Sequence, residues 1–158
     1  MSRVLIRIAV VSDAGSIARV LAEAFAEYRS LYTQAAFDAT CPASDTVLKR
    51  MTEGPVWVAE LAGVVAGTVA AVSKGDALYI RGMAILPAAR GQATGRLLLE
   101  IVEQYALEHG HQRVTLSTTP FLGRAIRLYE NFGFRRTEEA PQDLFGTPLF
   151  TMEKWLRH

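Results

Sequence analysis

The sequence predicts a mixed α+β fold, and three observations lead to this class. Three β-branched segments of strand length follow one another over residues 56–61, 64–73 and 77–86, with short turns between them. Amphipathic helix patterns lie before and after this group. A glycine-rich turn, 90–96, joins the third strand to the next helix. This order of elements is typical of an antiparallel sheet with segregated helices.

The first half of the chain predicts one strand and two helices before the hairpin. Val4 to Val10 alternates weakly and is rich in β-branched residues, which favours a strand. Ser12 and Asp13 can cap a helix that runs to about Tyr28 with one apolar face. Residues 30–44 show no clean period, and this stretch between the two helices is expected to form a flexible wall over a site. A shorter helix is predicted over 45–52.

The second half predicts alternating helices and strands after the hairpin. Gly82 interrupts the strand 77–86, and a glycine inside a strand often marks a bulge or a close backbone approach. Gly110 and Gly133 are expected to end helices. The remaining predicted elements are a helix over 94–108, a strand over 113–117, a helix over 122–132, a strand over 134–137, a loop over 138–143 and a strand over 148–155.

The composition is that of an ordinary globular chain. With 158 residues, half of them apolar, one domain with a real core is expected. The formal net charge of +1 gives no reason to expect nucleic acid or an anionic membrane as a partner. Cys41 is the only cysteine, which excludes an internal disulfide and a cysteine-rich metal site, and no metal is predicted. No secretory or membrane-spanning run is recognisable, so a cytoplasmic location is expected.

The turn from Arg90 to Arg96 has the composition of a phosphate site. It contains two glycines and two arginines between a predicted strand and a predicted helix. Backbone N–H groups at a helix N-terminus suit a phosphate, and arginines can add charge-assisted contacts. Its spacing differs from the glycine patterns of dinucleotide folds and nucleotide hydrolases. We therefore interpret 90–96 as a pyrophosphate cradle.

Three segments together resemble the GNAT superfamily of acyl-CoA-dependent N-acyltransferases. They are the apolar strand end Met83-Ala84-Ile85-Leu86-Pro87, the cradle, and the later run from Ala125 to Phe134. They are similar to the family's signature of an apolar strand, then [RQ]-x-x-G-x-[GA], then A-x-x-L-Y-x-x-x-G-F. The resemblance implies one N-acetyltransferase domain over 1–158. Its fold would be a mixed, mostly antiparallel sheet of about seven strands with about four helices, splayed between the fourth and fifth strands.

The resemblance also implies how acetyl-CoA would bind as cosubstrate. Backbone groups of Met83, Ala84 and Ile85 would pair with the pantetheine arm as with an added strand. Arg90 and Arg96 could contact phosphates through their guanidinium groups, although a solvated rim position explains Arg96 equally well. The backbone N–H groups expected at the pyrophosphate are those of Gly91, Gln92, Ala93, Thr94, Gly95 and Arg96.

The sequence departs from the family pattern at Ala93. Aligning Arg90 with the first motif position places Ala93 where the family usually has its first glycine, and Gly95 falls on the second. Alanine requires a negative φ more strictly than glycine does. A helix N-terminal conformation would tolerate it, so we expect a working cradle.

Tyr129 occupies the family position of the proton donor to the leaving thiolate, and we take it as the catalytic residue. The alternative is a core tyrosine, because Ile126 and Leu128 beside it have a core pattern. No general base can be assigned, since the strand before the cradle has no glutamate. Glu23, Glu27 or Tyr79 acting through a water could serve, as could a water chain alone.

The acceptor pocket is predicted between residues 28–41 and 138–147. Tyr28 and Tyr32 are candidate lining residues, Asp38 or Asp143 could attract a cationic amine, and Arg81 could bind a carboxylate.

The favoured function is transfer of an acetyl group from acetyl-CoA to a primary amine of a small molecule, peptide or protein by direct attack. The alternative is a catalytically silent acyl-CoA-binding sensor or interaction module, suggested by Ala93 and the missing glutamate. Homodimers are common in the family, and nothing in this sequence decides for or against one.

Overall fold

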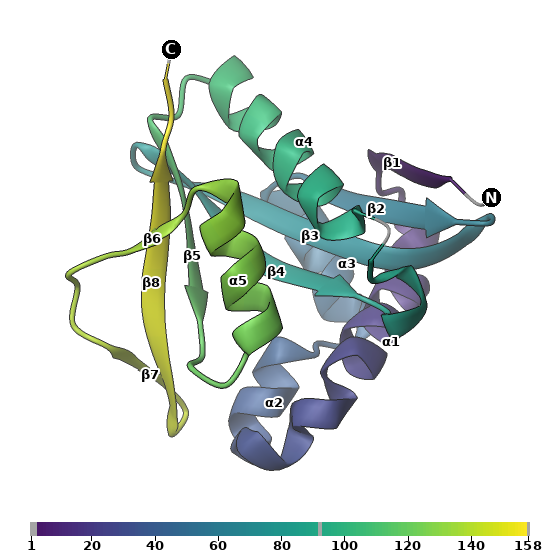
Figure 1. Cartoon of the computed structure of the whole chain (residues 1–158). Helices are drawn as coiled ribbons and strands as arrows, with labels where there is room; N and C mark the ends of the chain where they lie inside the picture. The colour runs from purple at the N-terminus through teal and green to yellow at the C-terminus, as the bar shows by residue number, and fades with distance from the viewer. Residues whose placement is uncertain (1–2, 92, 158) are drawn as a thin grey trace.

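The computed structural model describes residues 3–91 and 93–157 and confirms the mixed α+β class (Figure 1). Short 3₁₀ turns lie at Val11–Asp13, Ala26–Leu31 and Pro87–Ala89. No helix within the described ranges is both long and apolar enough to cross a bilayer. The elements are β1 Val4–Ile8, α1 Ala14–Phe25, α2 Gln34–Thr40, α3 Ser44–Glu53, β2 Val56–Leu61, β3 Val64–Lys74, β4 Ala77–Ile85, α4 Thr94–Glu108, β5 Arg113–Thr118, α5 Gly123–Phe132, β6 Arg135–Arg136, β7 Gln142–Leu144 and β8 Thr147–Trp155.

One sheet of eight strands organises the described residues. Its order is β1-β2-β3-β4-β5-β8-β6, and β7 pairs with β8. The first four strands form an antiparallel meander, as expected for a hairpin series. β4 and β5 are parallel, which requires a crossover, and α4 supplies it.

The predicted splay and bulge both occur in β4. β4 pairs with β5 only from Ala77 to Ile80, and the two strands then separate. On the other side of β4, Gly82 lies opposite Ala70 while Ile80 lies opposite Ala71, so Arg81 is the extra residue of a bulge. The bulge and the end of pairing coincide, and this opens the sheet beside Arg81 and Gly82.

Successive side chains of a strand point to opposite faces of the sheet, so the core is divided between these two faces. Trp57 packs in the cluster under α4, which includes Leu98, Leu99 and Val102. Val58, the next residue, packs on the opposite face against α1 and α3. Figure 1 shows α4 and α5 on one face and α1 and α3 on the other. The sheet is therefore covered on both sides around the splay.

The structure differs from the sequence-based prediction mainly between residues 26 and 44. The first α-helix ends at Phe25 and continues as a 3₁₀ turn, and residues 34–40, for which no helix was predicted, form α2. α2 begins because Thr33 Oγ1 accepts a hydrogen bond from the Ala36 N–H. The described chain thus has five α-helices instead of about four. The predicted strand 134–137 contracts to β6, and the predicted loop 138–143 already contains the start of β7.

Candidate functional site

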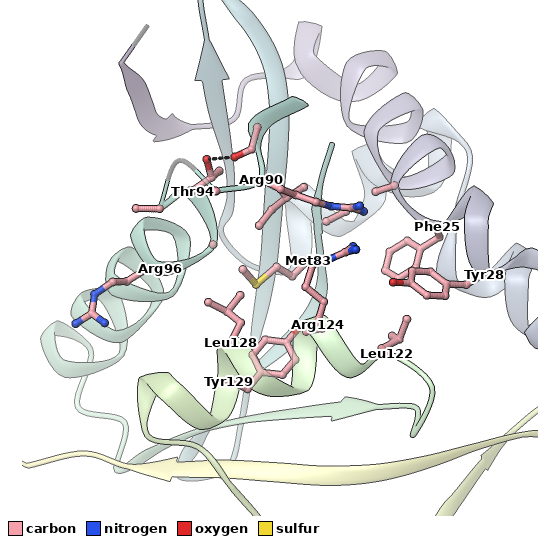
Figure 2. A pocket seen from close by; sticks show the side chains of 18 residues that line it. Phe25, Tyr28, Met83, Arg90, Thr94, Arg96, Leu122, Arg124, Leu128 and Tyr129 are labelled. Atoms are coloured by element: carbon pink, nitrogen blue, oxygen red, sulfur yellow. Dashed lines mark hydrogen bonds between the residues drawn. The ribbon is translucent and has the colours of Figure 1, made fainter. Parts of the chain in front are cut away.

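A cavity of about 360 Å³ lies between the edge of β4, the turn before α4, and α5 (Figure 2). Its walls are mainly apolar, and arginines stand at its mouth, as in many small-molecule sites. α1 closes the remaining side. The lining residues are Ala24, Phe25, Tyr28, Met83, Ala84, Ile85, Ala89, Arg90, Gly91, Ala93, Thr94, Gly95, Arg96, Leu122, Arg124, Ala125, Leu128 and Tyr129.

The edge of β4 contributes backbone groups to this cavity. Met83, Ala84 and Ile85 pair with β3 on one side. On the other side β4 has no partner strand after Ile80 among the described residues. Alternate N–H and C=O groups of an unpaired strand edge are free to bind an extended ligand. The cavity is therefore lined by a short strand edge that can accept one more strand.

The turn before α4 forms a backbone cradle. Gly91 and Ala93 both have positive φ, +80° and +61°. Such conformations turn successive N–H groups toward a common point, which is the geometry of an anion-binding nest. Thr94 begins α4, and its Oγ1 donates to the Ala89 carbonyl at 2.9 Å, which ties the turn to the preceding 3₁₀ segment. Gln92, predicted to take part, lies outside the described residues.

The expected conformation of Ala93 was wrong. Ala93 is the N-cap of α4 and lies in the left-handed region with φ +61° and ψ +15°. A helix N-terminal residue with negative φ had been expected. The left-handed conformation brings the Cβ of an L-residue close to the carbonyl oxygen and costs about 1–2 kcal/mol. Ala93 therefore adopts the glycine-like geometry of the cradle at the expense of strain.

Replacing Ala93 by glycine is expected to stabilise the protein by about 0.5–1 kcal/mol. Strain is relieved, and the greater freedom of glycine in the unfolded chain offsets part of the gain. Thermal unfolding should show a midpoint a few degrees higher. Ala62→Gly is the matched control, since Ala62 has φ +53° in a turn that does not line the cavity. A higher unfolding midpoint in Ala62→Gly without a higher midpoint in Ala93→Gly would contradict the left-handed conformation of Ala93.

Gly95 is required for packing rather than for its φ. A Cβ at this position would lie 2.6 Å from Cδ2 of Leu128 and 3.1 Å from Cδ1 of Ile85. The first turn of α4 therefore packs directly against side-chain ends from α5 and β4, which would have to shift to admit a side chain. Both contacting side chains line the cavity, so Gly95 sets the width of the cavity at this point.

Three arginines line the cavity, with different partners. Arg90 contacts Glu27 at 3.2 Å, and Arg124 contacts the same carboxylate at 3.6 Å. Figure 2 shows both side chains extending toward Phe25 and Tyr28, whereas Arg96 points away along α4. Arg96 is exposed and pairs with Glu100. This favours a solvated position at the rim of the cavity over a phosphate contact.

Arg124 was not identified from the sequence. It precedes the A-x-x-L-Y run by one residue, and only the docking of α5 beside the cradle brings it near Arg90. Two guanidinium groups sharing one exposed carboxylate can exchange it for a bound phosphate.

Tyr129 is buried on α5 and lines the cavity. Burial raises the pKa of its phenol to about 12, so the group stays protonated throughout the physiological range. Its ring also packs against Phe134, with ring centroids 5.9 Å apart. Tyr129 therefore combines a core position with a place at the cavity wall.

Stability should fall at alkaline pH because of Tyr129 and Tyr32, and Cys41 adds to the fall from about pH 9, since burial raises the pKa of its thiol to about 11. Burial raises the pKa of each phenol to about 12 from 10.0. Between these values the unfolded chain has lost the proton and the folded chain retains it, so unfolding becomes easier as pH rises. Each group contributes up to about 1.4 kcal/mol per pH unit. Denaturant unfolding from pH 9 to 12 should show this slope, and Tyr32→Phe should reduce it. An unchanged slope would contradict the raised pKa.

A second cavity, of about 320 Å³, lies on the other side of the splay. Phe25, Met83, Leu122 and Tyr129 line both cavities, so the two meet at these side chains. The lining residues are Leu21, Phe25, Tyr32, Ala39, Thr40, Arg50, Tyr79, Ile80, Arg81, Gly82, Met83, Leu116, Ser117, Thr118, Thr119, Leu122, Tyr129, Leu144 and Leu149.

The predicted acceptor residues are divided between the two cavities. Tyr32 and Arg81 line the second cavity, while Tyr28 lines the first. Asp38 and Asp143 line neither. Asp38 accepts a hydrogen bond from Gln34, and Asp143 accepts one from the Gly146 N–H. Their side chains are thus engaged locally and do not face the second cavity.

The candidate bases are likewise separated. Glu23 is exposed and pairs with Arg19, and Glu27 holds the two arginines described above. Tyr79 lines the second cavity.

Burial raises the pKa of the Cys41 thiol to about 11, which makes it a poor nucleophile. Among the described residues no group of three His, Cys, Asp or Glu side chains could hold a metal.

Comparison with known sequences gives one consistent result. Residues 17–134 match the family model described as the acetyltransferase (GNAT) family. The uncharacterized N-acetyltransferase YjgM of Escherichia coli is 33% identical over 134 residues, covering 81% of this chain and 80% of that protein. A probable N-acetyltransferase family 8 member 5 of mouse is 34% identical over 90 residues, covering 53% of this chain and 40% of that protein.

Solved structures with the same fold include two that are described with a bound cofactor. The PaiA N-acetyltransferase of Thermoplasma acidophilum, in complex with coenzyme A, has a TM-score of 0.80 at 16% identity and covers 97% of this chain and 99% of that one. YncA of Salmonella typhimurium, a putative acetyltransferase with acetyl-CoA, has a TM-score of 0.74 at 24% identity. The match covers 98% of this chain and 95% of that one. At these identities the likeness concerns the fold.

Proposed function

Because the chain belongs to the acetyltransferase (GNAT) family of acyltransferases, we propose that it transfers an acetyl group from acetyl-CoA to a primary amine. The observation that carries this proposal is the meeting of two cavities at Met83 and Tyr129. One cavity suits the donor and the other the acceptor. The acetyl group could pass from one cavity to the other beside Met83 and Tyr129, because these side chains line both cavities.

The first cavity fits the shape and charge of the CoA arm. The unpaired edge of β4 can pair with the two amides of pantetheine. The cradle from Gly91 to Gly95, at the N-terminus of α4, suits the pyrophosphate. Arg90 and Arg124 can exchange Glu27 for phosphate oxygens. Acetyl-CoA would supply the activated acyl group at the end of this path.

The chemistry requires one nucleophile and one proton donor. A neutral amine in the second cavity attacks the thioester carbonyl carbon: a C–N bond forms, and the C–S bond breaks with its electron pair on sulfur. The amine nitrogen loses one proton to solvent, and the sulfur gains one from the Tyr129 phenol. The phenol then recovers a proton from solvent. Burial of Tyr129 keeps its phenol in the donating form.

A transfer assay tests this function. Wild-type protein with acetyl-CoA is offered amines of varied size and charge, including peptides, and the release of free CoA thiol is followed together with the product mass. We expect thiol release that depends on at least one amine. Saturable acetyl-CoA binding without release on any amine would instead support the catalytically silent acyl-CoA-binding module.

A further inference from the structure

The second cavity is lined by two cations, and the carboxylate of Glu53, which pairs with Arg81, does not line it. Arg50 and Arg81 are its only charged lining residues, and no aspartate or glutamate of the described chain lines it. Its other polar groups are hydroxyls, from Thr40, Ser117 and Thr118 among others. Such a cavity is poorly suited to a purely cationic amine and suited to a ligand that also carries negative charge.

Arg50 is the cation that lacks a partner. Within the described residues its guanidinium makes no hydrogen bond and no ion pair, although the side chain is half-buried. Burial and the nearby charge of Arg81 lower the pKa of Arg50, which shows that its positive charge is destabilised where it lies. A bound anion would remove this destabilisation.

Arg81 is held in place but keeps one donor free. Its Nη1 donates to Glu53 Oε1 at 2.8 Å, and its Nη2 approaches the Arg50 carbonyl at 3.4 Å. Its Nε is buried without a partner. Because Arg81 is the extra residue of the β4 bulge, its position is fixed by the sheet. Arg81 therefore adds a fixed positive charge to the cavity wall, and the guanidinium of Arg50 beside it keeps its donors for a ligand.

The unpartnered guanidinium lies next to the point of transfer. Nη1 of Arg50 lies 3.5 Å from where a Cβ of Gly82 would be, so it packs against the bare backbone there. Gly82 precedes Met83, which lines both cavities.

We propose that the acceptor is a free amino acid whose carboxylate binds Arg50 and Arg81 in the second cavity while its amine faces Met83 and Tyr129. The planar fork of a guanidinium matches a carboxylate in two parallel hydrogen bonds. A cavity of about 320 Å³ suits a small molecule. This inference rests on the proposed N-acetyltransferase function and specifies its substrate class.

Matched acceptors test the role of the carboxylate. Each of the common amino acids is assayed with acetyl-CoA beside its carboxamide and its decarboxylated amine, which keep the amine and the side chain. We expect at least one free acid to be acetylated with kcat/KM about 10- to 100-fold above its carboxamide, the range of a charged hydrogen bond. Equal rates for acid and carboxamide would overturn the inference and leave the acetyltransferase function intact.

Variants of Arg50 connect this preference to the residue. Arg50→Gln should raise KM for the amino acid about 10- to 100-fold with little change in kcat, and should leave KM for acetyl-CoA unchanged. Arg50→Lys should recover part of the loss, because it restores the charge without the fork. Lys49→Gln is the matched control, since Lys49 is exposed on the same helix and lines neither cavity. A KM unchanged in Arg50→Gln would contradict the assignment.

A binding measurement separates failure of this inference from failure of the function. The Nε–Hε signal of Arg50 is followed by NMR in CoA-saturated protein during titration with the same acids and carboxamides. Shifts with acids and not with carboxamides support the carboxylate site even if no amine is acetylated, in which case the proposed transfer fails alone. No shift with any acid overturns the inference.

Discussion

Tyr129→Phe is expected to lower kcat about 100-fold while KM for acetyl-CoA stays within about twofold. Phenylalanine keeps the ring that packs against Phe134 and removes only the hydroxyl. A positioned general acid typically contributes about 10²- to 10⁴-fold to a rate. Steady-state kinetics at saturating amine measure the effect. The folded state should be retained, because the ring packing is kept and the side chain lines two cavities into which the hydroxyl's place can open.

Tyr105→Phe is the matched control for this variant. Tyr105 lies on α4, where its ring packs against Trp57 and His109, and it lines neither cavity. It should keep wild-type kcat. If Tyr129→Phe also kept wild-type kcat, Tyr129 would be a core residue, and the proton on the leaving sulfur would come from solvent.

Gly95→Val should weaken acetyl-CoA binding at least tenfold and destabilise the fold by about 1–3 kcal/mol. The Cβ alone would lie 2.6 Å from a methyl carbon of Leu128, so either that side chain or α5 must move. Leu128 lines the first cavity, and its displacement narrows the space at the cradle. Isothermal titration with acetyl-CoA and denaturant unfolding measure the two effects.

Gln104→Val introduces the same residue on the exposed side of α4 and serves as the control. It should change acetyl-CoA affinity little and cost only the helix propensity of a β-branched residue, well under 1 kcal/mol. Wild-type affinity in Gly95→Val would show that the cavity beside Gly95 does not hold the cosubstrate.

Local signals in the sequence were sufficient to predict the elements that line the first cavity. The bounds predicted for α4, 94–108, agree with the structure because apolar spacing, the glycine-rich turn before it and Gly110 after it act in the same direction. Gly82 marked the bulge correctly, since a glycine weakens regular pairing inside a strand and lets the backbone bend there. Both features depend on neighbours in the sequence.

Features that depend on tertiary packing could not be predicted in this way. α2 is short and lacks a clean period, and its start depends on the cap at Thr33. The left-handed φ of Ala93 contradicts the preference of alanine and is imposed by the turn. Arg50 and Arg124 reach their cavities only because α3 and α5 dock beside β4. No motif or spacing in the sequence indicates that Arg124 lines the first cavity or that Arg50 lines the second.

The central claim is that acetyl-CoA occupies the cavity between β4, the cradle and α5. Backbone amide NMR of the uniformly labelled protein, titrated with acetyl-CoA, tests it most directly. We predict saturable shifts concentrated at the N–H groups of Met83 and Ile85 on β4 and of Gly91 and Gly95 in the cradle. No shift at these amides on addition of saturating acetyl-CoA, or shifts confined to another face, would contradict the claim.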